Sequence, residues 1–389
     1  MAMSFHRDTW AEINLDAISH NVKSMKKHIG TNVKLIAVVK ANAYGHGDFQ
    51  VAKAAISAGA EQLAVAFLDE AIALRTLGIT LPILVLGATR SEDVQLAIEY
   101  DLTLTCFSKD WLDDAKQNIR QGQLKLHLKV DTGMGRIGVT KEEELNEILV
   151  FLNSNPCFKL LGVYTHFSTA DEIETDYFKL QYERFTNMIR LIPDDNIQIH
   201  CANSATGLRF PDHAFNAVRF GIAMYGLTPS LDIVDELPFP LEEAFSLHSK
   251  LTHVKKVPKG TKVSYGATYE AGDDEWIGTI PIGYADGWIR RLSGSEVLVD
   301  GERVPIIGRI CMDQLMVKLP SEKPVGTKVT FIGKQGNEFI SVDEIAKRLE
   351  TINYEVTCSI TSRVPRLFLQ NGSIIEVRNP LLINAATIC

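Results

Sequence analysis

A lysine at the end of an apolar segment is the first residue in this chain whose type and position suggest chemistry. Lys40 follows the apolar run Lys34–Val39 and precedes the run Ala41–Gly47, which reads ANAYGHG. If the apolar run is a buried strand, the amine lies at its carboxyl end, and partial burial lowers the pKa of that amine. Such an amine can form a Schiff base with an aldehyde. A lone lysine at a strand end more often only reaches solvent, so the interpretation depends on the groups that accompany Lys40.

A second block suggests a site for a phosphate group. Asn203 and Ser204 precede a short predicted helix, and Gly221 and Ile222 follow a later apolar run. A serine hydroxyl beside backbone N–H groups at a helix start suits a phosphate, and glycine lets the backbone approach it closely. Ser204 alone more often indicates a plain helix N-cap. Together with Lys40 and Gly221, it favours a phosphate cup.

Histidines and a second lysine also occupy the ends of apolar runs. His166 and His200 each close such a run, which would suit a pair of metal ligands, but no carboxylate or third histidine has a matching position. Lys129 closes another run and is followed by Asp131 and Arg136. A plain ion pair between Lys129 and Asp131 is the simplest interpretation of their spacing.

One segment matches a nucleotide-binding pattern. Residues Gly133–Gly138 read GMGRIG and therefore spell GxGxxG. The match is weak, because its last glycine falls before the expected helix cap at Thr140 and no acidic residue ends the next strand. We therefore do not expect a nicotinamide cofactor.

Eight apolar runs alternate with amphipathic segments in the first 60% or so of the chain. They are short, rich in Val, Leu, Ile and Ala, and show little alternation, as is typical of parallel strands buried on both faces. Eight such strands separated by helices predict a (β/α)8 barrel of the TIM type, in which the carboxyl ends of the strands share one mouth. The runs are Lys34–Val39, Gln62–Ala66, Ile83–Leu86, Leu102–Cys106, Leu124–Val130, Leu160–Thr165, Ile197–His200 and Phe215–Val218.

The sequence pattern changes after Pro229. Segments there alternate polar and apolar residues, and turns such as Asp300-Gly301 and Gly336-Asn337 separate many of them. One helix is expected after Ser341, a residue suited to an N-cap, with Glu344 three residues later. The expected strands include Lys250–Val257, Trp276–Ile282, Glu296–Val299, Met316–Leu319 and Lys328–Ile332.

These patterns predict an α/β protein of two domains. The N-terminal barrel is expected at residues 12–235, and a mostly β domain at residues 236–389. The opening strand, residues 9–15, precedes the first barrel helix and is expected to join the β domain.

The composition narrows the class of protein. The chain of 389 residues carries a formal net charge of −8 and has no long basic run, which argues against a nucleic-acid partner. The first ten residues lack the apolar core of a signal peptide, and no apolar run approaches the roughly 20 residues of a membrane span. The six cysteines are scattered without a CxxC pair, and no HExxH motif occurs. We therefore expect a cytoplasmic protein without a structural metal.

The segment that begins at Lys40 matches the cofactor-lysine signature of alanine racemases nearly letter for letter. Further blocks follow in the order of that family, so the chain resembles the fold-type III, pyridoxal 5′-phosphate (PLP)-dependent alanine racemases over nearly its whole length. The resemblance implies an isomerase that binds PLP and interconverts L-alanine and D-alanine, supplying D-alanine for the peptidoglycan of the cell wall. It also implies a homodimer whose active sites are shared across the interface, with no membrane partner.

The resemblance assigns the groups that carry the reaction. Lys40 serves one face of the substrate carbon, and Tyr265, in an SYG block contributed by the partner subunit, serves the other. Arg219 binds the pyridine nitrogen of PLP in the family. Because arginine keeps its proton, the ring becomes a weaker electron sink, whereas related decarboxylases place a carboxylate there.

Other residues receive supporting roles from the resemblance. His166 packs against the ring and helps to tie the tyrosine to Arg219 and His200. The backbone of Met312 helps to hold the substrate carboxylate, and a carbamate on Lys129 would position Arg136 beside it. The remaining matches are phosphate contacts at Tyr44, Ser204 and Tyr354, with Asn203, Gly221 and Ile222 in the same blocks; an access corridor with Asp171, Tyr284, Arg290 and Arg309; and Cys311 and Asp313 beside Met312.

Two other classes of function remain open. The first is another enzyme of this architecture, either a racemase of broader specificity or an amino-acid decarboxylase. Arg219 argues against the decarboxylase, and Tyr354 favours a small substrate side chain. The second is a non-enzymatic PLP carrier built on a lone barrel, against which the C-terminal third with Tyr265 argues.

Overall fold

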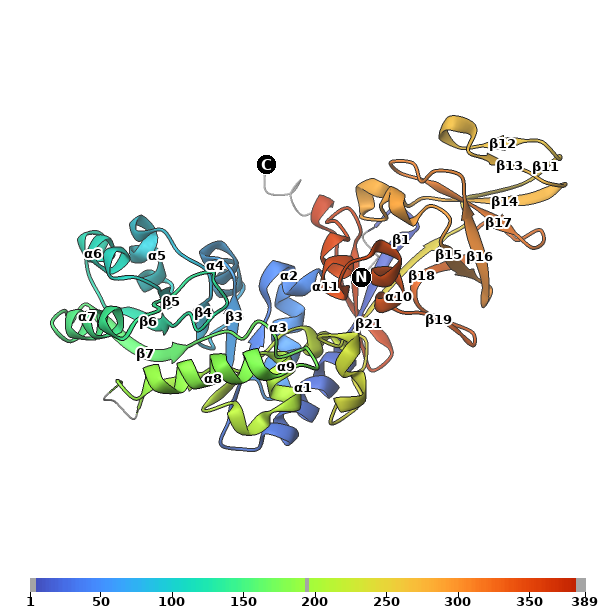
Figure 1. Cartoon of the computed structure of the whole chain (residues 1–389). Helices are drawn as coiled ribbons and strands as arrows, with labels where there is room; N and C mark the ends of the chain where they lie inside the picture. Colours follow the sequence, from blue (N-terminus) through green and yellow to red (C-terminus); the bar gives the residue numbers. More distant parts are fainter. Residues whose placement is uncertain (1–4, 193–195, 383–389) are drawn as a thin grey trace. The chain divides into compact units, whose positions relative to one another are not determined.

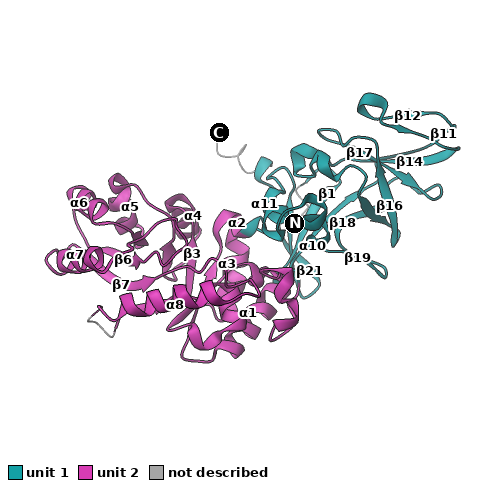
Figure 2. Ribbon diagram, in the orientation of Figure 1, with its two compact units in different colours: residues 1–16, 44–47, 243–389 teal, residues 17–43, 48–242 magenta. Residues whose placement is uncertain are grey.

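The computed structural model describes residues 5–192 and 196–382, which belong to two compact units. Figure 1 shows the elements along the chain, and Figure 2 distinguishes the two units by colour. The barrel unit comprises residues 17–43 and 48–242, and the β unit comprises residues 1–16, 44–47 and 243–389. The chain therefore enters the barrel unit, returns to the β unit for four residues after position 43, and then completes the barrel unit.

Eight parallel strands form one sheet in the barrel unit, in the order β8-β7-β6-β5-β4-β3-β2-β9. Isolated bridges from His200 to Phe215 and from Ala202 to Val218 join the two ends of this order, so the sheet nearly closes on itself. The prediction of a (β/α)8 barrel is confirmed. The strands are β2 (Lys34–Val38), β3 (Gln62–Val65), β4 (Ile83–Val85), β5 (Thr103–Cys106), β6 (Leu124–Lys129), β7 (Phe158–Tyr164), β8 (Gln198–His200) and β9 (Ala217–Phe220).

The predicted runs agree with these strands to within two residues at each end. Buried parallel strands need apolar residues on both faces, which is why continuous apolar runs locate them well. The last run shows the clearest displacement, since β9 begins at Ala217 rather than Phe215. Phe215 has a φ of 53°, and the Asn216 side chain accepts a hydrogen bond from the Ile199 N–H, so the chain turns there before the strand starts.

Helices follow the barrel strands. The short helix α9 (Ser204–Arg209) begins after Asn203, whose side chain accepts the Thr206 N–H at 2.9 Å. Within the described ranges, no helix combines the length and apolar character needed to cross a bilayer. The other helices are α1 (Leu15–Ile29), α2 (Lys40–Tyr44), α3 (Asp48–Ser57), α4 (Leu68–Thr76), α5 (Val94–Glu99), α6 (Lys109–Asn118), α7 (Glu142–Asn153) and α8 (Asp176–Ile189).

The β unit is built on a sheet of eleven strands, with the main order β11-β14-β17-β16-β15-β18-β10-β1-β20-β21 and β19 paired with β18. The first strand of the chain, β1 (Thr9–Asn14), runs antiparallel to β10 and parallel to β20. A separate hairpin consists of β12 (Lys262–Val263) and β13 (Tyr269–Glu270). The other strands are β10 (Phe245–Lys250), β11 (His253–Val257), β14 (Glu275–Ile280), β15 (Glu296–Val299), β16 (Glu302–Ile307), β17 (Leu315–Leu319), β18 (Lys328–Gln335), β19 (Glu338–Ile340), β20 (Arg366–Gln370) and β21 (Ser373–Arg378).

The strand predicted over Lys250–Val257 starts too early. It corresponds to β11, which begins at His253, whereas Lys250 is the last residue of β10. β10 pairs with β18, whereas β11 pairs with β14. The two residues between them, Leu251 and Thr252, donate their N–H groups to different neighbours, so the chain changes partners at this point.

The prediction of a single helix in this part of the chain is incomplete. Helix α10 (Val342–Leu349) begins as expected, since Ser341 Oγ accepts the Glu344 N–H at 3.0 Å. A second helix, α11 (Asn353–Ser359), follows it. The residue before α11 is Ile352, which offers no side-chain cap, so the sequence carries no start signal for this helix.

Candidate active site

Three polar residues lie side by side at the ends of three neighbouring barrel strands. The register of β6, β7 and β8 pairs Lys129 with Tyr164, and Tyr164 with His200. All three residues are buried. The Tyr164 ring stacks on His200 with 4.9 Å between centroids, and the Lys129 Nζ lies 5.2 Å from the same ring. The parallel register therefore gathers residues from distant parts of the sequence at one end of the barrel.

Arg219 on β9 is the buried centre of this group, with 3% of its surface exposed. Its guanidinium donates to His200 Nδ1 at 2.8 Å and to His166 Nδ1 at 3.3 Å. It also donates to the carbonyl oxygens of Thr165 at 2.8 Å and Cys201 at 2.9 Å. None of these acceptors is a carboxylate. Burial lowers the pKa of Arg219 to about 10, which still leaves it charged at neutral pH.

These hydrogen bonds determine where two histidines carry their protons. Arginine only donates, so His200 accepts at Nδ1 and carries its proton on Nε2. That N–H lies 2.9 Å from His127 Nδ1 and donates to it. Burial, and then the charge of Arg219, lowers the pKa of His127 to about 3 and the pKa of His200 well below its ordinary value. Both rings are neutral, and they form a directed chain from Arg219 through His200 to His127.

Sequence reasoning did not identify His127. It lies inside β6 between two leucines rather than at the strand end, where functional residues of a barrel are sought. Its ring packs against Gly162, where an added Cβ would come within 2.6 Å of the ring. The available signal was a polar residue within a buried apolar run, which requires a hydrogen-bond partner. His166, by contrast, was predicted and contacts Arg219; burial lowers its pKa well below the ordinary value.

Lys129 and Asp131 are bonded to different groups. The Lys129 Nζ donates to the Val130 carbonyl at 2.9 Å. The Asp131 carboxylate accepts three backbone N–H groups from the loop Gly133–Arg136, at 2.8 to 3.1 Å. The interpretation of these residues as a plain ion pair is therefore wrong, and Asp131 instead shapes the loop that carries Arg136. Burial, and then the charge of Arg219, lowers the pKa of Lys129 to about 7.

Ser204 and Gly221 meet although they belong to different elements. The Gly221 N–H donates to Ser204 Oγ at 2.9 Å, and Ser204 is buried. Asn203 caps α9, so the Ser204 hydroxyl does not serve as the cap. Ile222 begins the next turn and is also buried. A hydroxyl, a glycine backbone and a helix start are thus gathered here, and these are donors of the kind that bind phosphate.

Lys40 opens a left-handed turn. Residues Ala41–Tyr44 all have φ values of 52° or 53°. Each non-glycine residue in this region costs roughly 1–2 kcal/mol, so such a run persists only where the surroundings hold it. Glu70 contributes to this, because its carboxylate accepts the Ala41 N–H at 2.6 Å and also two backbone N–H groups after β3. Glu70 was not singled out from the sequence, since a glutamate in the first turn of a helix is ordinary.

In the β unit, Tyr44 lies beside Tyr354 of α11. Their ring centroids are 6.0 Å apart, and burial, reinforced by Tyr354, raises the pKa of Tyr44. Gly45 has a φ of 84°, and an added Cβ would lie 2.2 Å from the Thr357 carbonyl oxygen, so only glycine fits there. The two tyrosines expected at the phosphate are therefore neighbours.

A second group of predicted residues surrounds a hollow of about 450 Å³ in the β unit. Tyr265 is 69% exposed and Met312 is 52% exposed. Two loops distant in sequence meet here, because Ser264 Oγ donates to the Arg309 carbonyl at 2.5 Å. The lining residues are Ser264, Tyr265, Cys311, Met312, Asp313 and Gln314.

The residues expected in an access corridor come from both units. Tyr284 adjoins the hollow, since its N–H donates to the Cys311 carbonyl at 3.0 Å. Arg290 and Arg309 are exposed residues of the β unit. Asp171 is half-buried in the barrel unit, where burial raises its pKa.

Two family models match the chain: the alanine racemase N-terminal domain over residues 13–229, and the alanine racemase C-terminal domain over residues 244–368. The chain is 62% identical over 378 residues to alanine racemase 1 of Bacillus subtilis (strain 168), covering 97% of each chain. A crystal structure of alanine racemase from Bacillus anthracis with bound L-Ala-P is similar, with a TM-score of 0.95, 53% identity, and coverage of 97% of this chain and 99% of that one. A histidine racemase from Leuconostoc mesenteroides subsp. sake is also similar, with a TM-score of 0.90, 33% identity, and coverage of 95% and 100%.

Proposed function

The chain belongs to the alanine racemase family and interconverts L-alanine and D-alanine, and from this premise we propose that Lys40 and Tyr265 transfer the proton. Racemisation takes the α-proton from one face of a carbon and returns a proton to the other, so it needs a group on each side. Lys40 takes the proton of D-alanine, and Tyr265 takes the proton of L-alanine. The observation that carries this proposal is the exposure of Tyr265 in a hollow beside Met312, because a tyrosine that only packs would be buried.

PLP is the cofactor that the family implies, and the donors of the barrel unit fit it. When bound, PLP supplies an electron sink that stabilises the carbon after its proton has left. Lys40 would hold the aldehyde, Ser204 and Gly221 would hold the phosphate, and Arg219 would bind the ring nitrogen. The fit rests on a buried guanidinium whose acceptors exclude any carboxylate, and on a hydroxyl and a glycine N–H gathered at a helix start.

Arg219 also restricts the reaction type. A guanidinium keeps its proton, so Arg219 would leave the ring nitrogen of bound PLP unprotonated and the electron sink weak. The neutral His200 and His127 behind it offer no carboxylate that would reverse this. A weak sink suits a reaction that only removes and returns a proton, which favours racemisation over decarboxylation.

Two neighbouring tyrosines of the β unit are assigned to the phosphate end of the cofactor. Burial keeps Tyr44 protonated, so its hydroxyl is a donor, and Tyr354 lies beside it. The proposed phosphate contacts are Tyr44, Asn203, Ser204, Gly221, Ile222 and Tyr354.

We assign the PLP-binding domain to residues 12–235 and the β domain to residues 236–389.

The substrate carboxylate is assigned to Arg136 and the Met312 backbone. Asp131 holds the loop of Arg136 through three backbone N–H groups. Lys129 carries a carbamate, formed when the neutral amine attacks CO2, makes an N–C bond and releases one proton to solvent. A pKa of about 7 populates that neutral amine at neutral pH. Native mass spectrometry would detect the adduct, which acidification should release as CO2; an unmodified Lys129 in bicarbonate buffer would exclude it.

The active enzyme is a homodimer in which each subunit supplies Tyr265 and Met312 to the other. Their exposure in the single chain supports this, because a group that acts on substrate in a partner's site cannot be covered by its own chain. The enzyme works in the cytoplasm, and its D-alanine is used for peptidoglycan.

The first test is incubation of the PLP-loaded protein with L-alanine in D2O, followed by chiral analysis. D-alanine with α-deuterium is expected. Lys40→Ala should abolish turnover, and Tyr265→Ala should abolish racemisation while PLP stays bound. Tyr269→Phe is a matched control on the same segment, because the Tyr269 hydroxyl is bound to Glu275 rather than facing the hollow.

Isotope exchange separates the roles of the two groups. The enantiomers have equal free energies in water, so kcat/KM for racemisation must fall equally in both directions in any variant. The rate at which each enantiomer loses α-deuterium is not subject to that constraint. In Tyr265→Ala, exchange from D-alanine should continue through Lys40, whereas exchange from L-alanine should stop. Equal loss of both exchanges would contradict the assignment.

A racemase of broader specificity is the alternative, favoured by the similarity to a histidine racemase. Comparison of kcat/KM for L-alanine, L-serine and L-histidine distinguishes the two. A preference for alanine is expected, since Tyr354 favours a small side chain. Comparable values for histidine would establish the broader range.

A further inference from the structure

A chain of alternating charges lies behind the hollow of the β unit. Asp286 is fully buried, and its carboxylate accepts from Arg7 Nη1 at 2.8 Å and from the Gly283 N–H at 3.0 Å. Arg363 approaches the same carboxylate, with its Nε 3.7 Å from Asp286 Oδ1. A buried carboxylate is tolerated only when it is paired and hydrogen-bonded in this way, so these partners offset the cost of burying Asp286.

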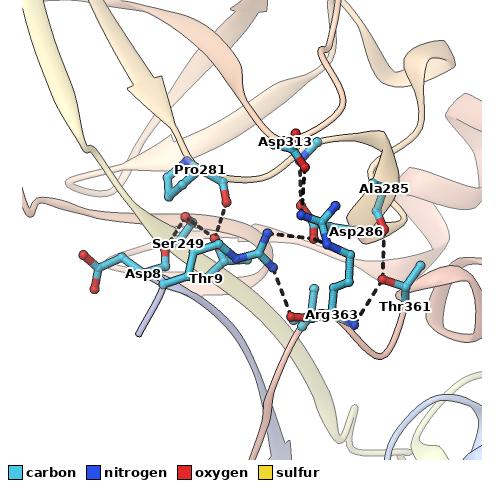
Figure 3. Close-up of polar contacts among 12 residues, drawn as sticks. Asp8, Thr9, Ser249, Pro281, Ala285, Asp286, Asp313, Thr361 and Arg363 are labelled. Carbon is cyan, nitrogen blue, oxygen red and sulfur yellow. Dashed lines mark hydrogen bonds and ion pairs between the residues drawn. The ribbon is translucent and has the colours of Figure 1, made fainter. Parts of the chain in front are cut away.

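Arg363 extends the chain of charges to the hollow. Its Nη2 donates to Asp313 Oδ1 at 2.7 Å, and Asp313 lines the hollow next to Met312. Figure 3 shows Arg363 between Asp286 and Asp313, with dashed lines to both. The Arg363 carbonyl in turn accepts from Arg7 Nη2 at 3.1 Å. The resulting order is Arg7, Asp286, Arg363, Asp313, with no net charge.

The turn that contains Asp286 also forms backbone hydrogen bonds with the loop that carries Met312 and Asp313. The Tyr284 N–H donates to the Cys311 carbonyl at 3.0 Å, and the Ala285 N–H donates to the Met312 carbonyl at 3.1 Å. At Gly283 the approach is so close that an added Cβ would lie 2.3 Å from the Cys311 carbonyl oxygen. Side chain and backbone therefore restrain the loop from the same turn.

We propose that Arg363 is a positioning residue, which fixes the Met312–Asp313 loop to the buried Asp286 and thereby sets the position of the substrate-carboxylate site. This rests on the proposed role of the Met312 backbone in binding that carboxylate. Arg363 does not itself touch substrate; it acts through Asp313 and the loop.

The geometry requires an arginine. Two carboxylates on different elements are contacted by different nitrogens of one rigid guanidinium, Nε and Nη2. A lysine ammonium is a single point of charge on a flexible stem, so it cannot hold both carboxylates in fixed positions. The pair with Asp313 is half-exposed, so its main effect is on geometry rather than on overall stability.

The test compares Arg363→Gln, Arg363→Lys and Asp313→Asn in the PLP-saturated protein. Each should raise KM for alanine roughly tenfold with a much smaller change in kcat, because the carboxylate site moves while the proton-transfer groups stay. Propionate, which has the carboxylate of alanine without its amine, should lose affinity as an inhibitor in parallel. Arg363→Gln combined with Asp313→Asn should be no worse than either alone.

Arg303→Gln is the matched control. Arg303 is another partly exposed arginine of the β unit, paired with Glu296, Glu338 and Glu344 and absent from the hollow. It should change the unfolding midpoint at most and leave KM and propionate inhibition unaltered. An unchanged KM in Arg363→Gln, or additive effects in the double variant, would overturn the proposal. Absence of racemisation in the parent protein would instead overturn the proposed function.

Discussion

The two units of the molecule each contain a network centred on arginine, and they balance charge in opposite ways. In the barrel unit, the hydrogen bonds of Arg219 go to imidazole nitrogens and backbone carbonyls. In the β unit, Arg7 and Arg363 alternate with the carboxylates of Asp286 and Asp313.

This difference in charge balance indicates which buried charge has no opposite charge beside it and can therefore act on a ligand. A buried cation without a protein anion is costly, and it is tolerated where it binds an electron-rich group of a ligand. A network whose charges cancel has no such capacity and instead holds its elements in place. We therefore expect the barrel unit to supply the charge of the proposed site and the β unit to hold a loop in place.

The largest effect is expected from Arg219→Glu. This variant places a carboxylate in the barrel unit and so removes the contrast between the two networks. A carboxylate facing the ring nitrogen would favour its protonation and strengthen the electron sink, which removes the condition that suits racemisation. We expect kcat for alanine to fall on the order of a thousandfold. Arg219→Lys keeps the charge and should lose less. If steady-state kinetics at saturating PLP give Arg219→Glu a kcat within threefold of the parent value, the charge of Arg219 does not contribute to catalysis.

A smaller effect is expected from a change at His127, the neutral histidine that ends the hydrogen-bonded chain from Arg219 through His200. His127→Leu leaves the buried Nε2–H of His200 without an acceptor, which should lower the free energy of unfolding by roughly 1–3 kcal/mol. His127→Gln offers an amide oxygen as an acceptor and should lose less. Urea denaturation of both variants measures this, and equal losses would show that the hydrogen bond between the two histidines contributes nothing.

A separate effect on stability is a pH dependence that belongs to the barrel network alone. Burial lowers the pKa of Lys129 from 10.5 to about 7, so between these values the unfolded chain binds a proton that the folded chain lacks. The free energy of unfolding attributable to Lys129 therefore rises with pH across that window. Lys129→Met should flatten this part of the profile in urea titrations made without bicarbonate, which excludes carbamate. An unaltered profile would show that Lys129 is not desolvated.

The fold was predictable because burial imposes a simple pattern. The eight barrel strands are apolar on both faces, so their runs stand out, whereas the join between β10 and β11 is marked by no polar residue pattern or glycine. Helix α10 was predicted from Ser341, since a side-chain cap is a local signal. Helix α11 begins at Asn353, and Ile352 before it offers no side-chain cap, so packing within the β unit determines this helix.

The candidate site was predictable to the extent that its residues lie at strand ends or in family blocks. Arg219, His166 and His200 meet as those positions suggested. His127, Glu70 and the Arg363 network were not found, because each acts through partners from other elements and has an ordinary residue type for its local position. The left-handed turn after Lys40 was also not expected, since alanine does not favour that conformation.

The chemical groups, the positions of the eight barrel strands and the resemblance to a racemase family can all be recognised from the amino-acid chain alone. Those properties are local or follow from the periodicity of buried residues. Three features depend on the folded arrangement: Arg219 bonds to imidazole nitrogens and carbonyls, His200 carries its proton on Nε2, and Asp131 binds a loop instead of Lys129. Charge balance and hydrogen-bond direction depend on which side chains meet in space, and the register between strands far apart in the chain sets those meetings.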